Sequence, residues 1–292
     1  MMMKLNQPLT IMKCLFFAAL LSCGASLARG QQNSVGVSPA SIEAKVKRGA
    51  TYIQTYTLYN NTSARLRFSC SVLDYWYDEN NRRLTGRPGT LPHTASPWVQ
   101  FSPSEIVVEP GSSAAVKVII TVPLGAQGGY YTMPVFEALP VKEELTAEGS
   151  KENSSRASIG VRFRGLIMLA TEDANEYNVE IMGGKVAPPT DATPLELYID
   201  VRNRGTVHAR LQGTFAILDE RSALVGRGRL ESTRFLPGQR NTIKAAWAGT
   251  LSPGKYTALV TFSYDRINME PVSLSYEIPF VVVAPAKVAS RE

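Results

Sequence analysis

Apolar side chains recur at every second position along most of the chain. The clearest rows are Val116, Val118, Ile120 and Val122; Leu195, Leu197, Ile199 and Val201; Tyr256, Ala258, Val260, Phe262 and Tyr264; and Leu274, Tyr276, Ile278, Phe280 and Val282. A period of two places one row of side chains on one face of a sheet, so each row predicts a half-buried β-strand. Nothing comparable repeats at helical spacing after the N-terminus, and the pattern therefore predicts an all-β fold.

Turn signals separate these rows. They include Pro110-Gly111, Gly128-Gly129, Pro237-Gly238 and Pro253-Gly254. Short strands with turns at this spacing are typical of antiparallel sandwiches. The apolar run 159–170 is followed by the polar stretch 171–178, and new strands begin near Val179. We therefore expect two tandem immunoglobulin-like β-sandwich domains, residues 33–174 and 175–284, followed by a polar tail, 285–292.

The first thirty residues have the features of a secretory signal peptide. Lys13 precedes an apolar run, 14–21, and small residues follow. This order of basic, apolar and small residues predicts export to the periplasm or the medium. Cleavage after Ala28 or Gly30 is favoured over a lipoprotein-type cleavage before Cys23, which would leave a lipid anchor there. No other apolar run is long enough to span a bilayer, so we expect no transmembrane body.

The net charge does not point to nucleic acid. Removing the first thirty residues takes away three basic side chains and no acidic ones, which lowers the charge from +6 to about +3. This excess is too small to argue for phosphate binding. Cys70, the one cysteine certain to remain after export, lies in the alternating row Leu66, Phe68, Cys70 and Val72. We expect it to be a small buried side chain and not a reactive thiol.

Residues that could carry catalysis are scarce. Of the two histidines, His93 lies in a loop and His208 alternates outward beside the inward row Val207, Ala209 and Leu211, so we expect both to be solvated. No HExxH, CxxC or GxSxG motif occurs. We therefore expect no enzyme, no catalytic residues, no metal ligands and no cofactor. A hydrolase with two facing carboxylates is the remaining enzymatic alternative.

Two segments of the first domain stand out by composition. Tyr75-Trp76-Tyr77 is the most aromatic patch, and it fits either the core or an interface, or stacking on carbohydrate. The stretch from Val141 to Ala157 is rich in Glu, Lys and Ser and poor in apolar residues. Such a composition cannot bury enough apolar surface to order itself, so we expect a mobile loop before the last strand of the domain.

An ordered series of segments runs through the first domain. It comprises Val37-Ser38-Pro39, a strand ending in Asn60-Asn61, the long strand 66–77, Pro97-Trp98-Val99-Gln100-Phe101-Ser102-Pro103, the turn Glu109-Pro110-Gly111, and a last strand from Ile159. This order resembles the N-terminal domain of the periplasmic pilus assembly chaperones, the PapD-like fold, over just under half of the chain. The resemblance implies a chaperone-like protein that binds a client, such as a fimbrial or other surface-fibre subunit.

The last strand of the first domain is the candidate site under this resemblance. In the pilus chaperones that strand is lent to a subunit that lacks a strand. Ile159, Val161 and Phe163 supply the alternating apolar side chains here, and Arg162 and Arg164 are candidate anchors for a client carboxylate. An ordinary core strand is an equally good interpretation of the same alternation.

The sequence departs from the family where the family holds the subunit's C-terminal carboxylate. The family uses an Arg on the first strand and a Lys on the last. Here the first strand reads Ser41-Ile42-Glu43-Ala44, and the nearest position on the last strand is Leu166. The second domain, with Phe235-Leu236-Pro237-Gly238 and Leu251-Ser252-Pro253-Gly254, looks like the immunoglobulin-like modules of bacterial surfaces. A cell-envelope adhesion or peptidoglycan- or glycan-binding module is therefore the alternative function.

Overall fold

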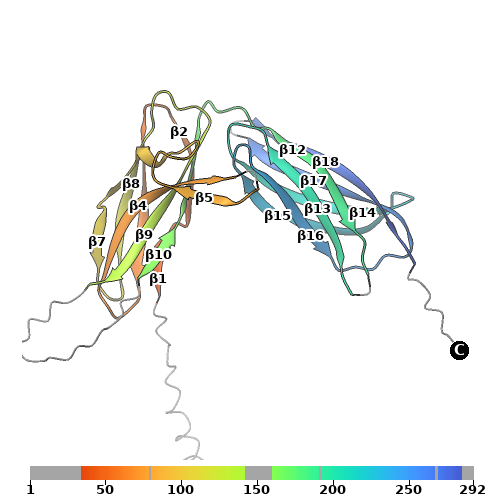
Figure 1. Cartoon of the computed structure of the whole chain (residues 1–292), viewed down its shortest axis with the longest axis horizontal. Coiled ribbons are helices and arrows are strands. Elements are labelled where there is room, and N and C mark those ends of the chain that lie inside the picture. The colour runs from red at the N-terminus through yellow and green to blue at the C-terminus, as the bar shows by residue number, and fades with distance from the viewer. Residues whose placement is uncertain (1–33, 79, 142–159, 191, 267–268, 285–292) are drawn as a thin grey trace, which may run out of the picture.

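The computed structural model describes residues 34–78, 80–141, 160–190, 192–266 and 269–284. Within them the chain is made of strands and one short 3-10 helix, η1 (Ser96–Trp98), so the all-β prediction is confirmed. The expected signal peptide, the charged loop beyond Val141 and the polar tail lie outside the described residues. Figure 1 shows two sandwiches inclined to each other and joined at one end.

The first sandwich packs a four-stranded sheet against a larger one. The four-stranded sheet has the order β1-β3-β8-β6, and the larger has the order β2-β11-β9-β4-β5, with β10 also on β9 and β7 also on β4. The strands are β1 (Val35–Ser38), β2 (Ser41–Val46), β3 (Thr51–Asn60), β4 (Leu66–Tyr77), β5 (Arg83–Gly86), β6 (Val99–Ser102), β7 (Glu105–Val108), β8 (Ser112–Thr121), β9 (Gly129–Pro140), β10 (Val161–Arg164) and β11 (Leu166–Thr171).

The second sandwich has two antiparallel sheets. Their orders are β12-β13-β16 and β15-β14-β17-β18. The strands are β12 (Val179–Ala187), β13 (Leu195–Asn203), β14 (Ala209–Asp219), β15 (Leu224–Phe235), β16 (Arg240–Trp247), β17 (Gly254–Arg266) and β18 (Met269–Val282). The two tandem immunoglobulin-like sandwiches that the turn spacing predicted are thus present.

The alternating rows form the two cores. Val116, Val118 and Ile120 have no exposed surface, and they pack against Phe68 and Ile167 from the opposite sheet. In the second sandwich, Leu197 and Ile199 pack in the same way against strands of the other sheet. Burying a side chain of this size stabilises the fold by about 1.5–3 kcal/mol. Cys70 is only half-buried at the edge of the first core, a partial correction to the expected full burial.

A buried asparagine closes the corresponding strand end in each sandwich. The Asn60 side-chain amide donates to the carbonyl oxygens of Ala64 and Val108, at 2.8 and 2.9 Å. Asn203 donates in the same way to Val207 and Phe235, at 2.8 and 3.0 Å. Each amide thus satisfies backbone acceptors that would otherwise be buried without a partner. The Asn60-Asn61 signal in the sequence marks this turn.

The strand order at the edge of the first sandwich positions the candidate site. β10 and β11 pair with β9 in one unbroken register, from Val161 opposite Ala138 to Ala170 opposite Gly129. On the side of this strand that faces away from β9, β2 pairs in parallel with β11 but not with β10. The segment before β2 forms β1, which belongs to the opposite sheet and pairs with β3. Among the described residues, the outer edge of β10 therefore has no paired strand.

Candidate functional site

The unpaired edge of β10 is the first element of the candidate site. Its pairing with β9 uses one side of the strand, so the N–H and C=O groups on the other side are available to another chain. Figure 1 shows β10 toward the end of the first sandwich that lies away from the second. The edge therefore lies where a long partner could reach it.

Burial falls along this strand from one end to the other. Ile167 and Leu169 of β11 have no exposed surface, Phe163 of β10 is half-buried against the core, and Val161 is 38% exposed. All four lie in one alternating row on one face of the sheet. The apolar row of the core thus continues out of the sandwich exactly where the edge is unpaired. Ile159, the next member of the predicted row, lies outside the described residues.

The two arginines of β10 differ in their surroundings. Arg162 forms an ion pair with Glu137, the residue opposite it on β9, with 2.8 Å between Nη2 and Oε1. Arg164 is exposed and forms no ion pair with any carboxylate in the described part of the chain. The sequence did not distinguish the two arginines as candidate anchors. Of the two, Arg162 alone is paired with a described carboxylate.

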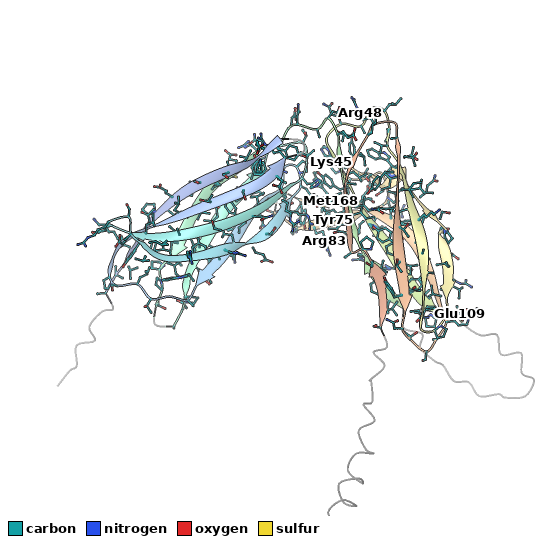
Figure 2. All side chains as sticks on the ribbon, turned by 180° about the vertical axis from the view of Figure 1, so that it is seen from behind. Lys45, Arg48, Tyr75, Arg83, Glu109 and Met168 are labelled. Atoms are coloured by element: carbon teal, nitrogen blue, oxygen red, sulfur yellow. The ribbon has the colours of Figure 1, made fainter. Side chains whose placement is uncertain are left out.

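A groove between the sandwiches continues from this strand. Its volume is about 410 Å³, and Leu166 and Met168 of β11 line it on one side. Arg210, Glu231 and Arg234 line it on the other side, from β14 and β15 of the second sandwich. Figure 2 shows Tyr75 and Met168, which line it too, at the junction of the two sandwiches. Leu166, the position where the family resemblance expects a Lys, is therefore part of an apolar wall.

Glu43 connects the sandwiches at the side of this groove. It lies beside Met168 in the parallel pairing of β2 and β11. Nε2 of His208 lies 3.1 Å from its Oε1, and Nε of Arg234 lies 3.4 Å from its Oε2. The hydrogen bond from His208 lowers the pKa of Glu43, partial burial opposes this, and the charges of His208 and Arg234 lower it further. The stretch in which the family resemblance implies an Arg thus carries a carboxylate with basic partners.

His208 corrects one expectation from the sequence. Its neighbours Ala209 and Leu211 point into the core as predicted, whereas Val207 is buried against Ala170 and Ala174. The His208 side chain is only 7% exposed instead of solvated. Its outward face is covered by the first sandwich, where its Nδ1 lies 3.4 Å from the Tyr131 hydroxyl. A proton on Nε2 lets the ring donate a hydrogen bond to Glu43. Alternation within one sandwich cannot reveal that a second sandwich covers this face.

Further hydrogen bonds and one apolar side chain also connect the two sandwiches at the junction. The Gly129 amide donates to the Thr206 carbonyl at 2.8 Å, and the Gln239 side chain donates to the Asn81 side chain at 2.8 Å. Gly128 has a φ of +88°, and a Cβ there would lie 2.8 Å from the Thr206 oxygen. Only glycine fits this approach of two backbones. Leu236 adds apolar contact with the first sandwich.

The aromatic patch and the other histidine lie next to each other. Tyr75 is buried, with its hydroxyl 3.0 Å from that of Tyr77, and Trp76 stacks on His93 with 5.2 Å between ring centroids. His93 is exposed, as the sequence predicted. The side chains of the Tyr75-Trp76-Tyr77 patch therefore pack at the junction and against the loop that carries His93, in agreement with the core or interface interpretation.

The residues that converge from the second sandwich, above all His208 and Arg234, were not predicted from the sequence. The one available signal was the stretch Ser41-Ile42-Glu43-Ala44, which lacks the Arg that the family resemblance implies there. In the described residues, no group of three or more His, Cys, Asp or Glu side chains could hold a metal ion. No helix in the same part of the chain is long and apolar enough to cross a membrane.

No protein-family model matches the sequence, and no curated protein matches it. Among solved structures, the chain is similar to the class 5 fimbriae chaperone CfaA, with 11% identity and a TM-score of 0.46 over 83% of this chain and 98% of that one. It is also similar to the CsuC–CsuE chaperone–subunit complex of Acinetobacter baumannii, with 15% identity, a TM-score of 0.41, and coverage of 84% and 98%. The Escherichia coli chaperone DraB is also similar, with 9% identity and a TM-score of 0.39 over 86% of this chain and 98% of that one.

These solved structures are chaperones of the kind that the residue pattern of the first domain resembles. At these identities and TM-scores, the similarity concerns the fold and carries no function.

Proposed function

We propose that this chain is an exported, chaperone-like protein that binds another polypeptide by strand addition at β10. The observation that carries the proposal is the outer edge of β10, which is unpaired among the described residues. There the apolar row of the core emerges from the sandwich, from buried Ile167 to exposed Val161. A client strand placed along this edge would gain backbone hydrogen bonds and would cover Val161.

Charge gives the client strand a direction. Arg164 is the exposed cation on this edge that pairs with no described carboxylate, whereas Arg162 is paired with Glu137. A carboxylate at the end of a client would therefore bind Arg164, close to the groove that begins at Leu166. A fimbrial or surface-fibre subunit that lacks one strand is the class of client that fits such an edge. Ile159 is the next apolar residue of the same alternation in the sequence, and it lies outside the described residues.

The test uses the full exported chain, co-expressed with envelope proteins and purified with whatever it retains. Amide hydrogen exchange of the complex and of the free chain then shows which segment gains protection. We expect protection at residues 160–164, and we expect Arg164→Ala to weaken capture by about tenfold or more, the value of one charge-assisted hydrogen bond. Val161→Thr should weaken capture with little change in the melting temperature, because the side chain is already partly exposed.

Arg229→Ala is the matched control, because Arg229 is an exposed arginine on β15 with no ion pair in the described structure. Capture that is unchanged by Arg164→Ala and Val161→Thr, or protection that appears elsewhere in the chain, would rule out strand addition at β10. A melting temperature that falls in step with capture would show that β10 is only a core strand.

A further inference from the structure

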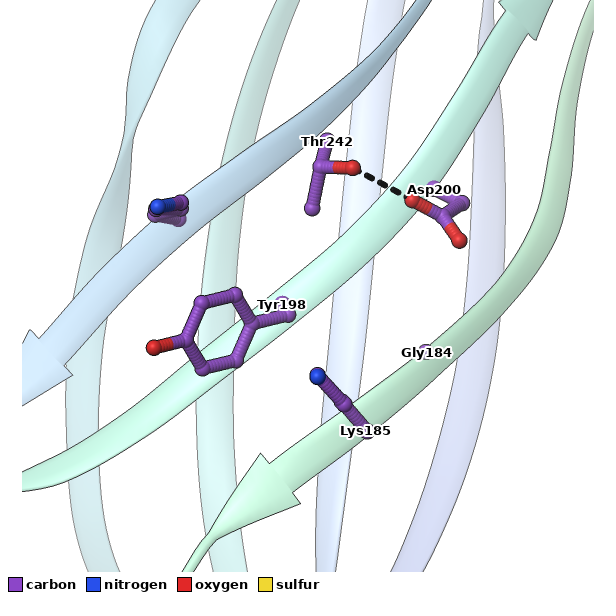
Figure 3. Close-up of a pocket in the computed structure, with 6 residues that line it drawn as sticks. Gly184, Lys185, Tyr198, Asp200 and Thr242 are labelled. Atoms are coloured by element: carbon purple, nitrogen blue, oxygen red, sulfur yellow. Dashed lines mark hydrogen bonds between the residues drawn. The ribbon is translucent and has the colours of Figure 1, made fainter.

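The second sandwich has a hollow on the outward face of its three-stranded sheet, formed by residues that take no part in the β10 edge. The hollow has a volume of about 450 Å³ and is lined by Gly184, Lys185, Tyr198, Asp200, Thr242 and Lys244. This volume lies within the range of small-ligand sites, about 300–1,000 Å³. Figure 3 shows the Tyr198 ring with one face toward the viewer, with Lys185 on one side of it and Asp200 and Thr242 beyond.

Three side chains form a row across the hollow. Lys185 of β12 pairs with Tyr198 of β13, and Tyr198 pairs with Lys244 of β16. Residues directly opposite each other point to the same face of a sheet, so the two lysines flank the ring. Their Nζ atoms lie 5.0 and 5.4 Å from the ring centroid.

The two ammonium groups have no carboxylate partner in the described part of the chain, although two acids are near. Asp200 accepts a hydrogen bond from the Thr242 hydroxyl at 2.5 Å and lies 3.9 Å from Arg240. Glu196 accepts from the Tyr198 hydroxyl at 2.5 Å. An anionic group placed between the two ammonium groups would be attracted by both of them.

The hollow also offers contacts that suit a sugar. The face of the Tyr198 ring that is turned toward the viewer in Figure 3 is electron-rich, and it attracts the polarised C–H groups on one face of a sugar ring. The carboxylates of Asp200 and Glu196, at the two ends of the Tyr198 ring along β13, can accept hydrogen bonds from sugar hydroxyls. A β-bulge between Ile181 and Gly183 leaves room beside β12, since a Cβ at Gly183 would meet no atom within 4 Å.

We propose that this hollow binds an acidic saccharide. The sugar ring lies on Tyr198, the acid group lies between Lys185 and Lys244, and hydroxyls donate to Asp200. This site is independent of strand addition at β10, because it shares no residue with that edge.

The test is calorimetric titration of the full chain with three probes: a galacturonate oligosaccharide, the neutral galactose oligosaccharide of the same length, and inorganic phosphate. We expect the galacturonate to bind and the neutral sugar to bind at least about tenfold more weakly. Lys185→Met and Lys244→Met should each weaken galacturonate binding by about tenfold, and Tyr198→Ala by a similar factor. Lys255→Met, at an exposed lysine of β17, is the matched control and should leave binding unchanged.

Each other outcome would overturn the proposal. No binding of galacturonate shows that the row only stabilises the sheet through cation–π contacts. Phosphate binding as strong as galacturonate binding, unchanged in Tyr198→Ala, shows a simple anion site. Equal weakening by Lys255→Met shows a diffuse charge effect. Circular dichroism of each variant confirms that the second sandwich remains folded.

Discussion

Asp74 is a carboxylate without exposed surface, and donors from a single loop surround it. The amides of Thr90 and Leu91 donate to Oδ2 at 2.6 and 2.8 Å, and the Thr94 hydroxyl donates to Oδ1 at 2.5 Å. Burial raises the pKa of Asp74, but the hydrogen bonds that it accepts outweigh this and lower the pKa below its ordinary value. One side chain thus fixes the loop that carries His93.

We expect Asp74→Asn to lower the free energy of unfolding by about 2–4 kcal/mol, because a side-chain amide would face donors that need an acceptor. The pKa of Asp74 is lower in the folded state than in the unfolded state. The stability that ionised Asp74 contributes is therefore fully present above about pH 4, and it is lost as the pH falls through the folded-state pKa. Urea unfolding between pH 3 and 7 measures this. Asp173→Asn, at an exposed ion pair with Arg48, should change stability by less than about 1 kcal/mol.

Cys70 should react slowly in the folded protein. Burial, and to a smaller extent the charge of Glu105, raises the pKa of its thiol to about 11, so little thiolate is present near neutral pH. We expect labelling by a thiol reagent at pH 7.5 to be at least about tenfold slower in buffer than in denaturant. Equal rates in the two solutions would contradict the position of Cys70 on the core side of β4.

The most informative element is the continuous strand formed by β10 and β11. Gly165 lies at its centre, where β2 begins to cover the outer edge. A Cβ at Gly165 would lie 3.0 Å from the Ala40 oxygen and 3.1 Å from Cγ of Pro134. The absence of a side chain there lets the Ala40 backbone, just before β2, and the Pro134 ring of β9 both approach. This close approach lies between the half of the strand that pairs with β2 and the half that does not.

We therefore expect Gly165→Ala to destabilise the chain by about 1–3 kcal/mol, because neighbouring backbone must move. Gly183→Ala is the matched control: the added methyl group meets nothing within 4 Å, and stability should change by less than about 0.5 kcal/mol. Urea unfolding of the two variants gives the comparison. A Gly165→Ala variant as stable as the Gly183→Ala variant would show that β2 and β9 are not held as closely as described.

At the scale of the whole molecule, the junction depends on charges and hydrogen bonds that cross between the sandwiches. Glu43 of the first sandwich accepts from His208 and pairs with Arg234, both in the second. The lowered pKa of Glu43 means that its contribution to stability is present above the unfolded-state pKa, about 4.3, and is lost as the pH falls below it.

We expect Glu43→Gln to lower stability at pH 7 by about 1 kcal/mol or less, since the Glu43 side chain is 42% exposed and solvent screens its charge. The variant should also lose less stability than the wild type between pH 6 and pH 3.5. Glu109→Gln is the control, because Glu109 pairs with Arg65 at the far end of the first sandwich (Figure 2). Small-angle X-ray scattering should show a wider distribution of shapes for Glu43→Gln alone. Identical scattering of the two variants would show that Glu43 does not restrain the junction.

Strands were predictable from the sequence because alternation depends only on neighbours within one sheet. Val118 and Ile199 are buried for that reason. The exposure of His208 was not predictable, because the side chains that cover it, Glu43 and Tyr131, are far away in the sequence. The candidate strand from Ile159 was found by family resemblance, but its unpaired edge depends on β1 pairing with β3, which a local pattern does not contain. The different surroundings of Arg162 and Arg164 were not predictable for the same reason, because the partner of Arg162, Glu137, lies on another strand.

The parallel pairing of β2 with β11 also determines when the first sandwich can close during synthesis. Leu166 pairs with Ser41, so one of the first strands to emerge must wait for a partner about 125 residues later. Until then the larger sheet lacks the strand that joins β2 to β9. The arrival of β10 and β11 completes the sandwich and forms the unpaired edge in the same step. The proposed strand addition at this edge therefore requires that the chain's own first sandwich has already folded.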